Sequence, residues 1–255
     1  MRGSARRLGG KIALVTGAAH GLGSAITERL IHEGARLVIA DIDEGGLADA
    51  AAKYGADVVP AWCDVTDPDA VRAAVLKAVE GFGGLDILVN NVGGDRARRL
   101  VDIEPEQWRR AMSLNLDGVF YGIKYAAPVL AENEGGTIIN ISSIAARQPS
   151  AGLSAYSTAK AGVEALTRAA ALELRSDGIR VNAVIPALFN TPGAQRSRRA
   201  LERSYGADLD AFATQRQERW GKPEELAAVV AHLASDEASF TTGLMYLLDY
   251  GHTIS

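Results

Sequence analysis

The sequence has 255 residues, of which 47% are apolar and 23% are charged, and its formal net charge is −4. This length and balance predict a chain that buries a sizeable core, and they argue against disorder as its main state. The small negative charge gives no overall attraction to nucleic acid or to an anionic membrane, and no apolar segment is long enough to span a bilayer.

Cysteine and histidine are sparse. Cys63 is the only cysteine and the four histidines are scattered, so the sequence offers neither an intrachain disulfide nor a metal-ligand cluster. The first residues, MRGSARRLGGKIALVTG, combine a basic run with only a short apolar segment, which is not typical of a signal peptide. We therefore expect a soluble cytoplasmic protein without a metal site.

Short apolar, β-branched runs recur along the chain and are typical of buried parallel strands. In order they are KIALVTG, RLVIAD, VVPAWCDV, LDILVNN, GTIINISS, IRVNAVIP and LMYLLDY. Helical patterns lie between them, at residues 21–33, 68–80, 105–131, 154–175 and 223–234. Strands alternating with helices predict an α/β fold, a doubly wound seven-stranded parallel sheet with helices on both faces.

No linker, composition shift or repeat divides the sequence, so we expect a single domain over residues 1–255. The stretch 187–220 is rich in Arg, Gln and small residues and delays the last helix. It is predicted to be a partly helical, mobile lid over the edge of the site.

The first strand ends in TGAAHGLG, which places Gly17, Gly21, Leu22 and Gly23 at the turn into the first helix. Glycines allow a pyrophosphate to approach the backbone, and a helix N-terminus offers N–H groups with a positive dipole end. Glycines also serve tight turns for steric reasons alone, so this motif by itself leaves both interpretations open.

The second strand ends at Asp41, near the offset of about 20 residues at which an acidic side chain accepts from adenosine ribose hydroxyls. A carboxylate there repels the 2′-phosphate of NADP, and no Arg or Lys follows it. This residue favours NAD, the alternative being a solvated Asp at a strand end.

The segment YSTAK places Tyr156 and Lys160 four residues apart, on one face of a predicted helix. A phenol has a reference pKa near ~10, and a neighbouring cation favours the phenolate, which makes proton transfer accessible at physiological pH. Ser142 and Ser143 end the preceding strand, at the sheet edge where α/β proteins bind ligands. Ser143 is therefore expected to donate to the substrate oxygen that Tyr156 protonates or deprotonates.

Together the motifs TGAAHGLG, Asp41, NNVG, SLNLDG, Ser143 and YSTAK resemble, in this order, the short-chain dehydrogenase/reductase family over nearly the whole chain. The resemblance implies hydride transfer between a secondary alcohol carbon and C4 of a nicotinamide. It implies that Ser143 polarises the substrate oxygen, Tyr156 is the acid/base, and Lys160 binds the nicotinamide ribose. Asn115 would hold a proton-relay water next to Lys160.

The resemblance also assigns cofactor contacts. Asp64 and Val65 would lie by the adenine, Asn91 by the adenosine ribose, and Pro186 and Thr191 at the nicotinamide end. The sequence departs from the family pattern at three places: Val92 in NNVG, Ala187 after Pro186, and LDYG at residues 248–251. These departures leave the shape of the substrate pocket open.

The expected function is NAD-dependent oxidation of a secondary alcohol or reduction of a ketone, on a small-to-medium apolar or alicyclic substrate. Two alternatives remain: an NADPH-dependent reductase of 3-oxoacyl or polyketide thioesters, and a non-catalytic dinucleotide-binding protein. Arginines at 96, 98, 99, 196, 198 and 199 admit an anionic substrate, although solvated surface charge is the favoured interpretation. The resemblance implies a homotetramer.

Overall fold

The computed structural model describes residues 6–94 and 96–254, so the first five residues of the N-terminal basic run lie outside the described chain. The described residues form a seven-stranded parallel sheet with the strand order β3-β2-β1-β4-β5-β6-β7, which confirms the predicted fold class. The strands are β1 (Ile12–Thr16), β2 (Arg36–Asp41), β3 (Val58–Trp62), β4 (Ile87–Asn90), β5 (Gly136–Ile141), β6 (Ile179–Pro186) and β7 (Met245–Leu248).

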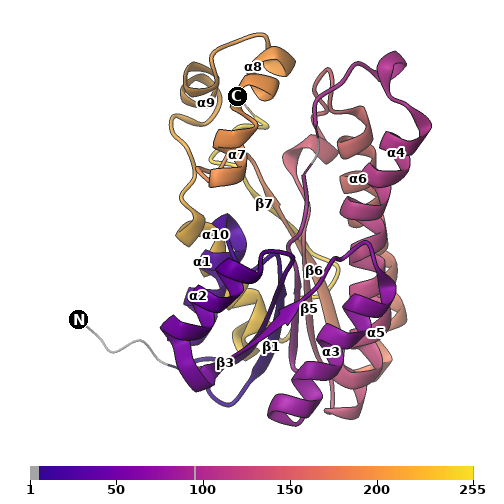
Figure 1. Ribbon diagram of the computed structural model, residues 1–255, viewed down its shortest axis with the longest axis vertical. Helices are drawn as coiled ribbons and strands as arrows, with labels where there is room; N and C mark the ends of the chain where they lie inside the picture. The colour runs from indigo at the N-terminus through magenta and orange to yellow at the C-terminus, as the bar shows by residue number, and fades with distance from the viewer. Residues whose placement is uncertain (1–5, 95, 255) are drawn as a thin grey trace.

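Helices cover both faces of the sheet (Figure 1). One face carries α1 (Gly21–His32), α2 (Glu44–Tyr54) and α10 (Pro223–Ala234), and the other carries α3 (Pro68–Phe82), α5 (Gly118–Glu132) and α6 (Ser154–Glu173). α4 (Pro105–Met112) packs against α6. The central strands are buried on both faces, since all five residues of β1 are buried. This explains their continuous apolar sequence, because a strand covered on both sides has no solvent-facing position.

The strand order reverses between β1 and β4. From β1 the chain winds outward to β3, and it then returns to place β4 on the other side of β1. The loops that follow β1 and β4 therefore diverge at the carboxyl edge of the sheet, which opens a crevice between them.

The helices differ from the sequence-based expectation at two places. The pattern at 105–131 predicted one helix, whereas the structure has α4, a π-helical turn at Ser113–Asp117, and α5. The helix α2 was not predicted, because its sequence EGGLADAAAKY buries only Leu47 and contains two glycines. Gly46 has a tertiary reason, since a Cβ there would lie 2.7 Å from Ala19 Cβ in the turn after β1.

The segment 187–220 forms three short helices, α7 (Pro192–Arg196), α8 (Arg198–Tyr205) and α9 (Leu209–Gln217). They stand above the carboxyl edge of the sheet, opposite α4 and the start of α6 (Figure 1). Leu188, Leu209 and Ala213 form a small core of their own within this segment. In the described residues, no helix has both the length and the apolar character needed to cross a membrane.

Candidate active site

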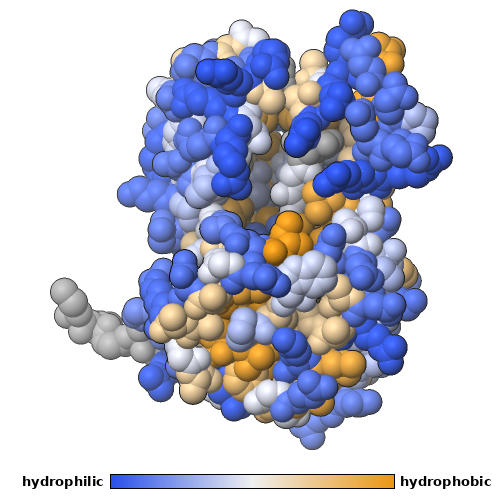
Figure 2. Space-filling model, viewed as in Figure 1, coloured by the Kyte–Doolittle hydropathy of each residue, from blue (hydrophilic) through white to orange (hydrophobic). Residues whose placement is uncertain are grey.

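Two adjoining cavities occupy the crevice at the carboxyl edge of the sheet, with volumes of about 430 and 440 Å³. Leu22, Asn91, Gly93 and Thr191 are among the residues that line both, so the cavities form one continuous cleft. The molecular surface is hollowed between the segment of α7 to α9 and the side formed by α4 and α6 (Figure 2). We call the first cavity the cofactor cleft and the second the substrate cavity.

The turn after β1 is built for close approach of a ligand to the backbone. Gly17 and Gly21 have φ angles of +65° and +56°, which a residue with a Cβ rarely adopts. A Cβ on Gly23 would overlap the carbonyl oxygen of Gly17, so this glycine lets α1 begin directly against the turn. Both Gly17 and Gly21 line the cofactor cleft, at the N-terminus of α1. Such a terminus suits the pyrophosphate of a dinucleotide.

Asn91 locks this turn to the end of β4. Its Nδ2 donates to the carbonyl oxygens of Thr16 at 3.0 Å and Gly17 at 3.1 Å, and its main-chain N–H donates to Thr16 Oγ1 at 3.1 Å. The side chain lines both cavities. Asn91 thus holds the two diverging loops of the crevice together, a role that its place in the NNVG motif did not reveal.

Asp41 ends β2 at the wall of the cofactor cleft. Its Oδ2 accepts from the N–H of Ala19 at 3.0 Å, and its Oδ1 accepts from the N–H of Asp43 at 3.1 Å. A carboxylate has about four acceptor positions, so each oxygen retains capacity for a ligand hydroxyl. Asp64 and Val65 line the same cleft, and Asp64 Oδ1 accepts from the N–H of Thr66 at 2.9 Å.

A second acid stands beside Asp41. Asp43 caps α2 through the N–H groups of Gly45 and Gly46, and its Oδ2 lies 2.6 Å from Nε2 of His20. The hydrogen bond with His20 is the main cause that lowers the pKa of Asp43. Sequence reasoning missed both side chains, because the contact joins two loops 23 residues apart.

Ser143, Tyr156 and Lys160 all line the substrate cavity. Ser143 follows β5, and its Oγ accepts from the N–H of Ala145 at 3.2 Å. Lys160 Nζ donates to the carbonyl oxygen of Ile141 at 2.8 Å, and Ser142 Oγ donates to the carbonyl oxygen of Lys160 at 3.2 Å. These two bonds tie the start of α6 to the end of β5, which brings the three residues to one place.

The ammonium of Lys160 is buried, with 2% of the residue exposed, and it lies 5.8 Å from the centre of the Tyr156 ring. Burial lowers the pKa of Lys160 from 10.5 to about 8, because water no longer solvates the charge. At neutral pH the group is still protonated, so a positive charge stands beside the phenol as the four-residue spacing predicted.

The π-helical turn positions Asn115. Its Nδ2 donates to the carbonyl oxygens of Gly94 and Ala111, both at 2.9 Å, and its Oδ1 accepts from the N–H of Gly94 at 2.9 Å. A Cβ on Gly93 would lie 3.0 Å from Asn115 Oδ1 and 2.8 Å from Lys160 Nζ, so this glycine lies between the two groups. The side chain of Asn115 therefore fixes the loop after β4, and both its amide hydrogens are occupied.

A buried chain of polar side chains connects α6 to the sheet. Asn90 Nδ2 donates to Asn140 Oδ1 at 2.9 Å, and Asn140 Nδ2 donates to Thr167 Oγ1 at 2.9 Å. The chain links β4, β5 and α6 across the interior. Asn140 and Thr167 were not among the predicted site residues. The signal that could have found Asn140 is an Asn within an otherwise apolar strand, which also occurs at Asn90.

Pro186 and Thr191 stand where the segment 187–220 begins. Pro186 ends β6 and lines the substrate cavity, whereas Thr191 lines both cavities and caps α7 by accepting from the N–H of Ala194 at 3.1 Å. A Cβ on Gly21 would lie 3.3 Å from Thr191 Cβ. The segment 187–220 thus begins beside the turn that follows β1.

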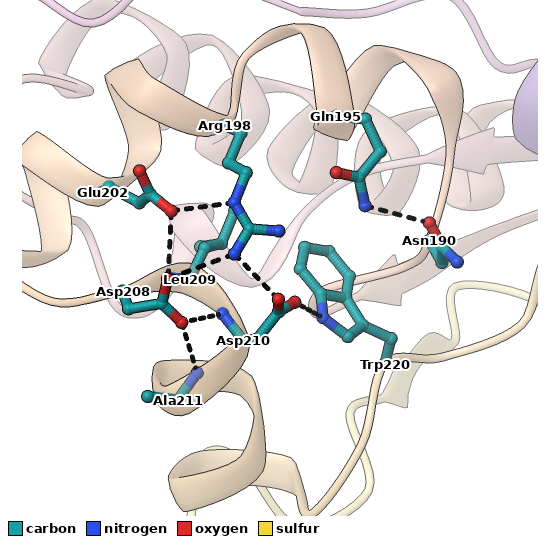
Figure 3. A network of polar contacts seen from close by, with 9 residues as sticks. All are labelled: Asn190, Gln195, Arg198, Glu202, Asp208, Leu209, Asp210, Ala211 and Trp220. Atoms are coloured by element: carbon teal, nitrogen blue, oxygen red, sulfur yellow. Dashed lines mark hydrogen bonds and ion pairs between the residues drawn. The ribbon is translucent and has the colours of Figure 1, made fainter.

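The arginines that the sequence places near the site differ in their surroundings. Arg198 lies close to three acids of the same segment: Glu202 at 2.8 Å, Asp208 at 3.2 Å and Asp210 at 2.8 Å (Figure 3). Its charge is therefore neutralised within the lid. Arg196 lines both cavities, whereas Arg96, Arg98 and Arg99 are exposed.

Known proteins resemble this chain over nearly its full length. A family described as enoyl-(acyl carrier protein) reductase matches residues 17–253. The chain belongs to the short-chain dehydrogenase/reductase family. The sequence is 37% identical to 3-oxoacyl-(acyl-carrier-protein) reductase of Thermotoga maritima, over 97% of this chain and 100% of the relative. It is 40% identical to cis-4-hydroxycyclohexanecarboxylate dehydrogenase of Sinomonas cyclohexanicum, over 95% of this chain and 96% of the relative.

The fold agrees with solved structures of the family. The crystal structure of 3-ketoacyl-(acyl-carrier-protein) reductase from Brucella melitensis, complexed with NADH, superposes with a TM-score of 0.86 at 31% sequence identity. The match covers 96% of this chain and 99% of that chain. As an oxidoreductase of this family, the chain acts with a nicotinamide dinucleotide on an alcohol or ketone.

The three departures from the family pattern have local structural consequences. Val92 packs against the phosphate turn, since a Cβ on Gly17 would lie 3.0 Å from its Cγ2. The N–H of Ala187 donates to the carbonyl oxygen of Leu248, so the position after Pro186 is tied to β7. Tyr250 in LDYG has a φ angle of +48°, within a turn held by Asp249, which accepts from the N–H of Thr253 at 2.9 Å.

Proposed function

We propose that the protein is an NAD-dependent dehydrogenase of alicyclic secondary alcohols. The observation that carries this proposal is that Ser143, Tyr156 and Lys160 share one cavity, which continues into a cleft that ends at Asp41. The residues around the cleft suit a dinucleotide, because the glycine turn accepts a pyrophosphate and Asp41 accepts from ribose hydroxyls.

The side chains of the chain transfer a proton and orient the substrate. During oxidation, the phenolate of Tyr156 takes the proton of the substrate hydroxyl while Ser143 donates a hydrogen bond to the same oxygen. A nicotinamide dinucleotide held in the cofactor cleft would supply the acceptor for the hydride of the alcohol carbon. Lys160 stabilises the phenolate through its charge, and Asn115 keeps the loop at Gly93 and Gly94 in place beside Lys160.

The substrate cavity supports an apolar body for the substrate. Its walls include Ile144, Leu153, Leu188 and Leu201. Apolar walls with a few convergent polar groups are typical of small-molecule sites. The relative from Sinomonas carries an alicyclic alcohol in its name, which supports a ring-shaped substrate for this chain.

A second candidate is an NADPH-dependent reductase of 3-oxoacyl thioesters, which the name of the Thermotoga relative favours. Asp41 argues against it, since a carboxylate at this position opposes a 2′-phosphate. A non-catalytic dinucleotide-binding protein is disfavoured, because Asn115, Ser143, Tyr156 and Lys160 are all present.

We also propose that residues 187–220 act as a lid that orders when cofactor and substrate bind. The three short helices make their own small core and begin directly above the phosphate turn. We propose a homotetramer from the exposed apolar side chains of α5 and α6, and a reducing, cytoplasmic location from the single cysteine.

The decisive experiment measures NAD and NADP reduction by the wild type with cyclohexanol and substituted cyclohexanols, and NADPH oxidation with a 3-oxoacyl thioester. We expect turnover of the cyclic alcohols with NAD. Tyr156→Phe should lower kcat by at least about 100-fold, with folding and NAD binding retained, because it removes the acid/base group. Retained turnover in this variant would contradict the mechanism, and faster thioester reduction with NADPH would favour the second candidate.

A further inference from the structure

The first helix of the segment 187–220, α7, presents one face to the cleft. Thr191, Gly193 and Arg196 each line both the cofactor cleft and the substrate cavity. Gly193 and Arg196 are three residues apart in α7, a spacing that places two residues on the same face of a helix. This face of α7 therefore borders the junction of the two cavities, which a dinucleotide that spans the cleft has to pass.

The start of α7 lies beside the turn that follows β1. A Cβ on Gly21 would lie 3.3 Å from Thr191 Cβ and 3.8 Å from Pro192 Cδ, so the chain enters α7 close to the first residue of α1. Thr191 caps α7 by accepting from the N–H of Ala194 at 3.1 Å. The cleft-facing side of α7 is thus held near the N-terminus of α1, where a pyrophosphate is expected.

Gly193 leaves space on this face of α7. Outside its chain neighbours and the helix backbone, a Cβ added at Gly193 would meet only Thr191 Oγ1, at 3.8 Å, which is an ordinary contact. The φ angle of Gly193 is not among the positive ones. Neither packing nor backbone conformation in the described chain therefore requires a glycine here, although glycine weakens a helix relative to alanine. Its missing side chain lets a ligand approach the backbone of α7.

The charges along the cofactor cleft are separated. Among the described residues that line it, the acids Asp41 and Asp64 stand at or just after the ends of β2 and β3, and Arg196 is the one Arg or Lys. His20 also lines the cleft, and its Nε2 lies 2.6 Å from Asp43 Oδ2. The cationic side chain that borders the cleft near α1 is thus Arg196, whose charge is opposite to that of a pyrophosphate.

Arg196 differs from the neighbouring arginines of the segment. Arg198 contacts Glu202 and Asp210, both at 2.8 Å, and Arg199 is exposed and lines neither cavity. Within the described residues, the exposed Arg196 guanidinium forms no ion pair. A guanidinium without an acidic neighbour can bind phosphate oxygens through its planar array of N–H donors.

We propose that Arg196 is a cofactor-binding residue that holds the pyrophosphate of the dinucleotide from the side of α7. The N-terminus of α1 would offer main-chain N–H groups from the opposite side. The same contact would draw α7 onto the cofactor, because Gly193 allows a close approach. This inference rests on the proposed function, and it names the residue through which the cofactor would order the segment 187–220.

A carboxylate on the substrate is the other anion that could meet Arg196, since this residue also lines the substrate cavity. The pyrophosphate is favoured, because Arg196 borders the cofactor cleft beside Thr191 and Gly193, and every nicotinamide dinucleotide carries this group. ADP separates the two sources, since it retains the pyrophosphate but has neither a nicotinamide nor a carboxylate.

The test measures NAD and ADP binding by calorimetry in the absence of substrate. Arg196→Gln should raise Kd for both ligands at least about fivefold, because a charge-assisted hydrogen bond at an exposed place is lost. Arg199→Gln, which removes an exposed arginine outside both cavities, should change neither Kd by more than about twofold. Saturating NAD should slow amide hydrogen exchange in residues 192–196 of the wild type and of Arg199→Gln, but not of Arg196→Gln.

An equal Kd for NAD in the wild type and Arg196→Gln would overturn the inference while leaving the proposed function intact. Weaker NAD binding with unchanged ADP binding would place the contact at the nicotinamide half and overturn it as well. If the wild type binds NADP and not NAD, the proposed cofactor fails, and the same comparison with NADP decides the inference, because both dinucleotides carry the pyrophosphate. A wild type that binds neither dinucleotide would overturn both proposals.

Discussion

The carboxylate of Asp41 lines the cofactor cleft, and each of its oxygens accepts a hydrogen bond from a main-chain N–H group. These bonds hold the side chain in one orientation before a ligand arrives. The neighbouring acid Asp43 is paired with His20, whereas Asp41 has no such partner among the described side chains. We propose that cofactor choice depends on Asp41, whose position is fixed by these main-chain bonds.

Replacing Asp41 by Ala should narrow the preference for NAD over NADP. NAD loses a charge-assisted contact worth about 1.5–3 kcal/mol, and NADP is relieved of repulsion at its 2′-phosphate. The measurement is the ratio of kcat/KM for the two cofactors with the same alcohol. An unchanged ratio, or a wild type that already favours NADP, would make Asp41 an ordinary strand-end residue.

The buried charge of Lys160 should make stability depend on pH. Folding lowers its pKa from 10.5 to about 8, so between these values the unfolded chain holds a proton that the folded protein has released. Stability relative to a Lys160→Met variant should therefore rise as pH increases through this window, by about 3 kcal/mol across the whole of it. Urea unfolding of both proteins from pH 7.5 to 10 measures this difference, and parallel profiles would refute it.

At the scale of elements, polar contacts join the helices of residues 187–220, the segment that we propose as a lid. Arg198 joins α8 to the start of α9, and Trp220 Nε1 donates to Asp210 Oδ1 at 2.7 Å, which draws the end of the segment to the same acid (Figure 3). The apolar core beneath these contacts is small. We propose that this segment opens at low cost in free energy, as a lid requires.

Arg198→Gln should speed amide hydrogen exchange in residues 192–217 by about threefold or more in the unliganded protein, since the contacts it loses are made only within the lid. Exchange in the sheet should stay unchanged. Arg199→Gln, which removes the adjacent charge but none of these contacts, is the matched control. Equal exchange in the two variants would show that the ion pairs do not hold the lid.

At the scale of the whole molecule, the proposed tetramer depends on the outer faces of α5 and α6. Phe120 on α5 and Leu172 on α6 are 44% and 66% exposed, which leaves apolar side chains on the same side of the sheet. Surfaces of this kind are typical of subunit contacts. The proposed tetramer would cover them.

Light scattering after gel filtration should give four times the 26.9 kDa mass of the chain. The double variant Phe120→Glu and Leu172→Glu should form smaller assemblies, because each new carboxylate would be buried without a partner at an apolar contact. Trp62→Glu is the control, since Trp62 is 53% exposed but lies on β3 at the far edge of the sheet. A monomeric wild type would refute the tetramer.

The sequence alone determined the sheet and the position of the cleft. Apolar runs such as IALVT can be buried only between two layers of helices, and glycines followed by Asp41 are expected at the edge where parallel strands end. The four-residue spacing of Tyr156 and Lys160 likewise predicts that they share a helix face, because helical periodicity is a local property.

Only the tertiary structure decided how these residues are held and what surrounds them. The π-helical turn at Asn115 depends on contacts with Gly94, 21 residues earlier, and α2 depends on Gly46 meeting the phosphate turn. A further cavity is lined by Ile144, Tyr205, Arg216 and His252, which no sequence spacing connects. Local periodicity predicts elements and their faces, whereas the walls of a cavity come from segments that meet only when the chain has folded.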